Sequence, residues 1–172
     1  MKAIYLTGFM GAGKTTIGKK LGKALKLPVI DTDQYIEEQV GKTIADIFAE
    51  YGEEVFRKYE RDFLKQLPTS DVIVTTGGGI VIQKDNRNWM KEHGHVVYLH
   101  SDINTIFERV KHDSTRPLFD SKQKENTVKL YTQRIPFYEE AQYKIDTSSK
   151  SFDEIVNNIK LWLQTESSGN NN

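Results

Sequence analysis

Residues 8–15, with the sequence GFMGAGKT, fit the phosphate-binding pattern G-x-x-x-x-G-K-[ST]. They follow an apolar run, residues 3–6, and precede a helical pattern. In that setting the glycines allow backbone N–H groups to surround a phosphate, and the following helix presents its positive end. Lys14 would reach the β- and γ-phosphates, and the Thr15 hydroxyl would ligate Mg²⁺. The run predicts a nucleoside triphosphate site, and a glycine-rich turn that binds nothing is the alternative.

Two carboxylates follow the next apolar run, residues 28–30, in the sequence Asp31-Thr32-Asp33. Carboxylates ligate Mg²⁺, and they orient the attacking alcohol in phosphoryl transfer. One of the pair could therefore help to hold a metal ion while the other faces a hydroxyl acceptor. The alternative for either residue is structural, because Asp is also a favoured N-cap of a helix.

Three consecutive glycines, Gly77, Gly78 and Gly79, follow the apolar run 72–74 and two threonines. A stretch without side chains would let a substrate lie against backbone N–H groups. The alternative is an ordinary flexible turn, since glycine clusters are typical of loops.

Three arginines lie in surroundings that favour anion binding, because Arg binds carboxylates and phosphates through two parallel hydrogen bonds. Arg57 belongs to a helical pattern, and Arg134 precedes Ile-Pro-Phe-Tyr. Arg116 lies in the polar segment 112–125, which breaks the helical period and contains a proline, as is typical of a mobile lid. Each arginine taken alone is more often a surface residue.

The elements that must position these residues are indicated by five short apolar runs that alternate with helical patterns. This alternation predicts an α/β fold, a three-layer sandwich with a five-stranded parallel sheet between helices. The runs expected to form buried strands are residues 3–6, 28–30, 72–74, 96–99 and 143–145. Because ligands bind at the carboxyl ends of such strands, the motifs that follow the runs are expected to converge.

Apolar residues at helical spacing mark the intervening helices. The stripes are Ile17, Leu21 and Leu25; Ile44, Ile47, Phe48 and Tyr51; Val55, Tyr59, Phe63 and Leu67; Ile103, Phe107 and Val110; and Val128, Tyr131 and Ile135. Ser151 and Glu154 form a capping-box pattern ahead of a last helix. The tail, residues 167–172, is expected to be disordered.

Composition narrows the function classes. A chain of 172 residues suits a single domain. Lys and Arg total 24, as do Asp and Glu, so no overall basic field favours a nucleic-acid or membrane partner. The absence of cysteine excludes disulfides, thiol catalysis and thiolate zinc sites. No apolar stretch is long enough to cross a bilayer and there is no room for a signal peptide, so a cytoplasmic enzyme is expected. The sequence shows no long apolar surface stripe, so a monomer is expected.

Six motifs in order make the chain resemble the shikimate kinase family along almost its whole length. The segments are GFMGAGKTT (8–16), DTD (31–33), IADIF with GEEVFR (44–48 and 52–57), GGG (77–79), RPL (116–118) and RIPFY (134–138). The resemblance implies a P-loop kinase of the nucleoside monophosphate kinase type. It would transfer the γ-phosphoryl group of ATP to the 3-hydroxyl of shikimate, on the route to chorismate and the aromatic amino acids.

The resemblance also implies residue roles. Asp33 would contact the accepting hydroxyl, and Arg57 and Arg134 would hold the shikimate carboxylate. The backbone of Gly78 and Gly79 would lie beside the ring of the substrate, and Phe48 and Phe56 would supply apolar walls. A shikimate-binding segment would span about residues 33–61. On the donor side, the ATP-binding residues would be Gly11, Ala12, Gly13, Lys14, Thr15, Thr16, Arg109 near adenine, and Arg116 in the lid. Lys14 and Arg116 would neutralise the moving phosphoryl group, and Thr15 and Asp31 would serve Mg²⁺, the latter through water.

One segment departs from the family, because residues 145–151 lack the proline of its adenine loop, and contacts to the base there stay open. Two other classes are also possible. A gluconate kinase or nucleoside monophosphate kinase would share the P-loop and lid but should lack the triple glycine and the Arg57/Arg134 pair. A regulatory GTPase would need N-K-x-D and D-x-x-G strings, and neither appears in the expected place.

Overall fold

Five parallel strands form the centre of the computed structural model, which describes residues 1–111 and 121–169. The strand order is β2-β3-β1-β4-β5. The strands are β1 (Ala3–Thr7), β2 (Val29–Asp31), β3 (Ile73–Thr75), β4 (Gly94–His100) and β5 (Tyr143–Asp146). Every pairing between them is parallel, which confirms the predicted sheet.

Burial varies across the sheet. The central strands β1 and β3 are buried throughout, whereas the edge strands carry exposed positions such as Val29 in β2 and Lys144 in β5. The expectation of five buried strands is wrong for these two, because an edge strand has a neighbouring strand on one side only.

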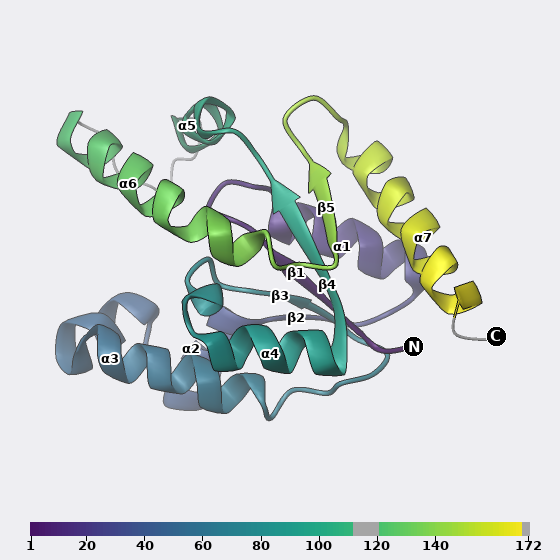
Figure 1. Ribbon diagram of the computed structural model, residues 1–172. Helices are drawn as coiled ribbons and strands as arrows, with labels where there is room; N and C mark the ends of the chain where they lie inside the picture. Colours follow the sequence, from purple (N-terminus) through teal and green to yellow (C-terminus); the bar gives the residue numbers. More distant parts are fainter. Residues whose placement is uncertain (112–120, 170–172) are drawn as a thin grey trace.

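Helices cover both faces of the sheet, as Figure 1 shows. Alternate residues of a strand point to opposite faces. Ile4 and Leu6 of β1 pack with α1 (Lys14–Leu25) and α7 (Phe152–Gly169). Ala3 and Tyr5 face the other layer, whose helices are α3 (Ile44–Leu64), α4 (Lys84–His93), α5 (Ile103–Lys111) and α6 (Ser121–Tyr138). The three-layer sandwich predicted from the sequence is confirmed.

All the predicted apolar stripes lie in helices, except that Leu67 follows the end of α3. The second and third stripes share α3, which bends at Gly52, where φ is 82°. Two α-helices, α2 (Thr32–Val40) and α4, and the short 3-10 helix at Ile80–Ile82 were not predicted. The α4 sequence, KDNRNWMKEH, has only two apolar residues and hence no stripe to detect. α2 packs on α3 beside the sheet, around Ile36, Ile47 and Phe56.

The start of the last helix is as predicted and its end is not. Ser151 Oγ accepts a hydrogen bond from the Glu154 backbone N–H at 3.1 Å, which confirms the cap. α7 continues to Gly169, so the expected disorder is wrong for residues 167–169, while residues 170–172 lie outside the described part. Of the predicted lid, residues 121–125 form the first turns of α6, and residues 112–120, with Arg116, are not described.

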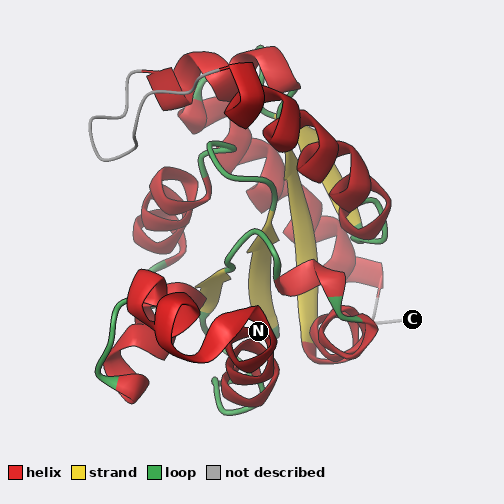
Figure 2. Ribbon diagram, turned by 90° about the vertical axis from the view of Figure 1, so that its left-hand side faces the viewer, coloured by secondary structure: helices red, strands yellow, loops and turns green. Residues whose placement is uncertain are grey.

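The loops at the carboxyl ends of the strands gather along one edge of the sheet, which Figure 2 shows from the side. They include the P-loop after β1, Asp31 at the end of β2 and the glycines after β3. In the described residues, no helix is both long and apolar enough to cross a membrane.

Candidate active site

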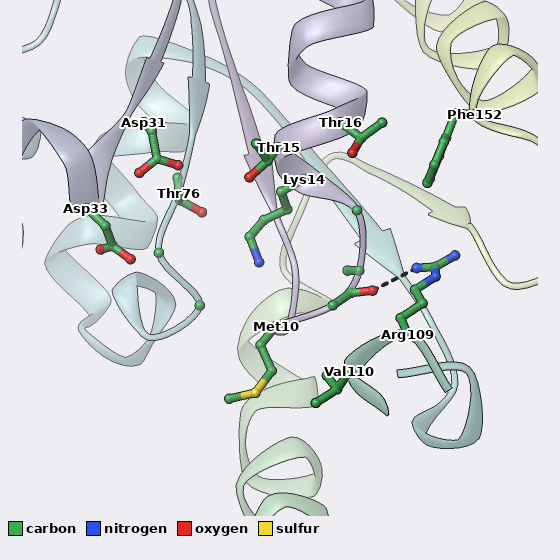
Figure 3. Close-up of a pocket in the computed structure, with 15 residues that line it drawn as sticks. Met10, Lys14, Thr15, Thr16, Asp31, Asp33, Thr76, Arg109, Val110 and Phe152 are labelled. Atoms are coloured by element: carbon green, nitrogen blue, oxygen red, sulfur yellow. Dashed lines mark hydrogen bonds between the residues drawn. The ribbon is translucent and has the colours of Figure 1, made fainter. Parts of the chain in front are cut away.

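A cavity of about 440 Å³ opens at this edge. Its wall includes all six predicted phosphate-binding residues, 11–16, together with Asp31, Asp33, Gly78 and Arg109 (Figure 3). Gly13 stands at the N-cap of α1 with φ 94°, a conformation that L side chains rarely adopt. α1 begins with neither a side-chain cap nor an acidic residue in its first turn. An anion at this helix terminus would meet backbone N–H groups and the positive end of the helix dipole.

Lys14 lines the cavity, and its amine lies against the P-loop backbone. Its Nζ donates hydrogen bonds to the backbone oxygens of Gly8 and, at 3.0 Å, Phe9. Figure 3 shows this side chain reaching from the start of α1 along the loop, with the two aspartates on the far side of the cavity. Lys14 is therefore placed between the phosphate loop and the carboxylates.

Asp31 is held by two hydrogen bonds. As the N-cap of α2 it accepts from the Gln34 backbone N–H at 3.0 Å, and its other oxygen accepts from Thr75 Oγ1 at 2.9 Å. The capping alternative is thus correct for this residue, which nevertheless lines the cavity. Its carboxylate is fixed in direction by β3 and by its own helix.

Asp33 lies in the first turn of α2 rather than on the strand, and it projects into the same cavity. Burial and the neighbouring Asp31 carboxylate raise its pKa to about 6, against the lowering effect of Lys14. Its buried Oδ1 has no hydrogen-bond partner. A Cβ added at Gly77 would lie 2.5 Å from that oxygen. Gly77, which the sequence marked only as part of a substrate-facing glycine stretch, therefore makes the space that Asp33 occupies.

Arg57 projects from α3 against the third glycine of the loop. Its Nη1 donates to Glu60 Oε1 at 2.5 Å, and its Nη2 lies 3.3 Å from Glu53 Oε1. A Cβ at Gly79 would come within 2.3 Å of the Arg57 guanidinium. The missing side chain at Gly79 is what admits the guanidinium at this point.

Arg134 reaches the neighbouring glycine from α6. It is 9% exposed, and a Cβ at Gly78 would lie 3.4 Å from its Nη1. Its guanidinium also lies over the ring of Phe9 in the P-loop, 5.8 Å from the centroid. Tyr138, whose pKa is raised by burial, donates from its hydroxyl to the Gly78 oxygen at 2.5 Å. Two arginines from different helices thus flank adjacent glycines.

The two predicted apolar wall residues differ in exposure. Their rings are 4.8 Å apart, but Phe56 is 4% exposed and packs with Ile36 and Ile47, while Phe48 is 37% exposed. Phe48 can therefore offer a ring face to a ligand, and Phe56 supports it from beneath.

The opposite end of the cavity is closed by Arg109 and Phe152 (Figure 3). Arg109 donates to the Gly11 oxygen at 2.8 Å and to the Thr147 oxygen at 3.1 Å, so it ties the P-loop to the loop after β5. Phe152, the first residue of α7, was missed. The sequence did contain a signal for Phe152, because this aromatic residue directly follows residues 145–151, the segment that corresponds to the adenine loop of the family.

Thr76 and Glu60 were missed as well. Thr76 lines the cavity next to Gly77, and Glu60 stands one helical turn after Arg57. The i,i+3 spacing of opposite charges in a helix is a signal that could have found Glu60. Arg116 lies outside the described residues, and the structure gives no information on it.

Within residues 1–111 and 121–169, no cluster of three or more His, Cys, Asp or Glu side chains could hold a metal ion by itself. A cation here would need ligands from a bound phosphate or water in addition to protein oxygens, which is how Mg²⁺ is bound in nucleotide sites.

The sequence model of the shikimate kinase family matches residues 10–164. A shikimate kinase of Bacillus cereus is 55% identical over 160 residues, which are 93% of this chain and 97% of that protein. The solved structure of shikimate kinase from Acinetobacter baumannii in complex with shikimate has a TM-score of 0.86 at 34% identity, covering 96% of this chain and 94% of that one. The shikimate kinase from Aquifex aeolicus has a TM-score of 0.82 at 33% identity, over 97% and 99% of the two chains. The phosphate loop, the paired arginines and these relatives agree, and the chain belongs to the shikimate kinase family of phosphotransferases.

Proposed function

We propose that this protein transfers the γ-phosphoryl group of ATP to the 3-hydroxyl of shikimate, with a donor half and an acceptor half that meet between Lys14 and Asp33. The observation that supports this arrangement best is the cavity itself. It has an uncapped helix terminus at one side and, at the other, the Asp33 carboxylate, whose buried oxygen has no hydrogen-bond partner.

On the donor side, the backbone of residues 11–16 binds the phosphates of ATP. The transition state of phosphoryl transfer is loose, so positioning and charge neutralisation supply most of the acceleration. Lys14 provides that charge near the transferred group. Arg109 and Phe152 lie where the base would stack, at the other end of the cavity from Asp33.

The oxygens present suit Mg²⁺. Thr15 offers a hydroxyl, and both oxygens of Asp31 already accept hydrogen bonds within the protein, which favours contact with the ion through water. When bound, the ion would offset negative charge on the phosphates. The residues that would hold it are Thr15 and Asp31.

On the acceptor side, Asp33 faces the reacting hydroxyl. An alcohol in a loose transition state loses its proton late, so this carboxylate orients the hydroxyl as much as it deprotonates it. Arg57 and Arg134 hold the substrate carboxylate against the backbone of Gly78 and Gly79. Phe48 and Phe56 support the ring. This pattern of one anion clamp and a few polar groups suits a small hydroxylated acid.

Arg116 and its segment keep the role of a lid that excludes water, which is the competing acceptor. A monomeric state and a cytoplasmic location also remain proposals, the latter because the reaction draws on ATP. Light scattering coupled to size-exclusion chromatography tests the first. A mass near 19.8 kDa is expected, and a mass near twice that value would contradict it.

The central experiment is ADP release in the presence and absence of shikimate, with NMR to locate the phosphate on the product. Turnover that requires shikimate and gives the 3-phosphate is expected. Gluconate and nucleoside monophosphates serve as competing acceptors. Phosphorylation of either one while shikimate is left untouched would overturn the proposal. A strong preference for GTP with slow turnover would point instead to a switch protein.

A further inference from the structure

Glu60 is a buried residue to which the proposed mechanism assigns no role. It is 1% exposed, and it is the one carboxylate that is fully buried in the described part of the chain. A buried carboxylate is costly unless it is paired and hydrogen-bonded. The way in which Glu60 is paired therefore bears on the function of the site around it.

The pairing is one-sided. Glu60 Oε1 accepts from Arg57 Nη1 at 2.5 Å, but the buried Oε2 has no hydrogen-bond partner. The charges that act on this group come from three helices: Arg57 of α3, Arg134 of α6 and the Asp33 carboxylate of α2. Glu60 therefore acts as the internal counterion of the two arginines that we assign to the substrate carboxylate.

We propose that Glu60 takes up one proton when shikimate binds, so that the carboxylate of the substrate replaces that of Glu60 as the anion facing Arg57 and Arg134. This inference rests on the proposed function, because it assumes that a carboxylate occupies this clamp. The proton comes from solvent and adds to Glu60, and no other bond forms or breaks.

The physical reason is repulsion between like charges in a buried site. Burial, with a smaller contribution from the Asp33 carboxylate, already raises the pKa of Glu60 to about 7, in spite of the lowering effects of Arg57 and Arg134. A second carboxylate brought against the same guanidinium disfavours the ionised form further. The unpartnered Oε2 is available to carry the proton, and protonation would leave the Arg57 contact at Oε1 in place.

The sign of the pH effect follows. At pH values well below 7, Glu60 is protonated with and without substrate, and no proton is taken up. Between 7 and the higher pKa of the complex, the free enzyme is largely ionised and the complex is protonated, so binding consumes a proton. The affinity for shikimate should then fall as the pH rises, by up to about tenfold per pH unit.

The test is calorimetric titration of the whole protein with shikimate at pH 7.5, in buffers of different ionisation enthalpy. The slope of the measured binding enthalpy against the ionisation enthalpy of the buffer gives the number of protons taken up on binding. An uptake of roughly half a proton or more is expected at pH 7.5, and about none at pH 5.5. The wild-type count is decisive by itself, even if a substituted protein fails to fold.

Three variants assign the proton. At pH 7.5, Glu60→Gln should bind shikimate without proton uptake, and its affinity should be flat from pH 7 to 8, above the pKa of about 6 of Asp33. Glu53→Gln is the matched control, because Glu53 contacts the same guanidinium at 3.3 Å but is 65% exposed, and uptake should persist. Uptake should persist in Asp33→Asn too.

The outcomes separate the two proposals. Binding of shikimate by the wild type with no proton uptake would overturn this inference and leave the function intact. Uptake that is lost in Asp33→Asn and kept in Glu60→Gln would overturn it also. Absence of shikimate binding to the wild type would overturn the proposed function, and this inference with it.

Discussion

Asp33 combines a buried oxygen that lacks a partner with a position across the cavity from Lys14. We expect Asp33→Asn to lower kcat by about a hundredfold or more, because an amide cannot accept the proton of the hydroxyl. The ATP dissociation constant, measured by calorimetry, should stay within about twofold, since the donor half lies on other elements. A comparable loss of ATP affinity would contradict this division of roles.

Arg57 is expected to act on the other substrate. Arg57→Ala should raise the KM for shikimate by about tenfold to a hundredfold, the worth of hydrogen bonds to a charged group, with little change in the KM for ATP. Arg61→Ala is the matched control, because Arg61 lies one turn further along α3, is 38% exposed and pairs only with Asp62 among the described residues. Equal effects in the two variants would argue against the clamp.

At the scale of elements, the site depends on how loops from four strands are joined. Arg109 connects the P-loop to the loop after β5, and Phe152 brings the start of α7 against Gly13, where a Cβ would lie 3.1 Å from its ring. Arg134 contacts Phe9 of the P-loop while it flanks Gly78. Arg134 of α6 thus connects the P-loop to the glycine loop that we assign to the acceptor side.

This arrangement gives a prediction for α7. Phe152→Ala should raise the KM for ATP by about tenfold, because stacking of a base on an aromatic ring contributes about 1–3 kcal/mol. The KM for shikimate should change little. Leu161→Ala, on the same helix but 60% exposed, is the control. Steady-state kinetics with each substrate varied in turn measure both KM values. An unchanged KM for ATP in Phe152→Ala would contradict the stacking of Phe152 on the base.

At the scale of the whole molecule, the buried sheet holds these loops in register. Leu6 in β1 is fully buried between α1 and α7, two residues before the P-loop begins at Gly8. Leu6→Ala should lower the free energy of unfolding by about 2–5 kcal/mol, as deletion of core methyl groups leaves a cavity. Urea unfolding measures this change. Leu161→Ala should change the free energy of unfolding by no more than about 0.5 kcal/mol. Similar losses of stability in the two variants would contradict the assignment of Leu6 to the core.

The sequence alone determined the strands, most helices, the phosphate loop and the family. Those features depend on local spacing: apolar runs, helical stripes, and glycines that must stand at set distances from Lys14. α4 was not predicted because its ten residues carry only two apolar side chains. The helical end of α7 was not predicted because its composition is typical of a frayed tail.

Only the tertiary structure decided how residues far apart in the chain share one site. Gly77 makes room for Asp33, Gly79 admits Arg57, and Glu60 is buried with a single hydrogen-bond partner. No local pattern contains these facts, because each depends on distances between elements separated by tens of residues. Burial is likewise a property of the packed molecule, and it raises the pKa values of Asp33 and Glu60 to about 6 and about 7. The phosphate loop could thus be recognised from its own residues, whereas the proposed acceptor site depends on where three helices and a glycine loop meet.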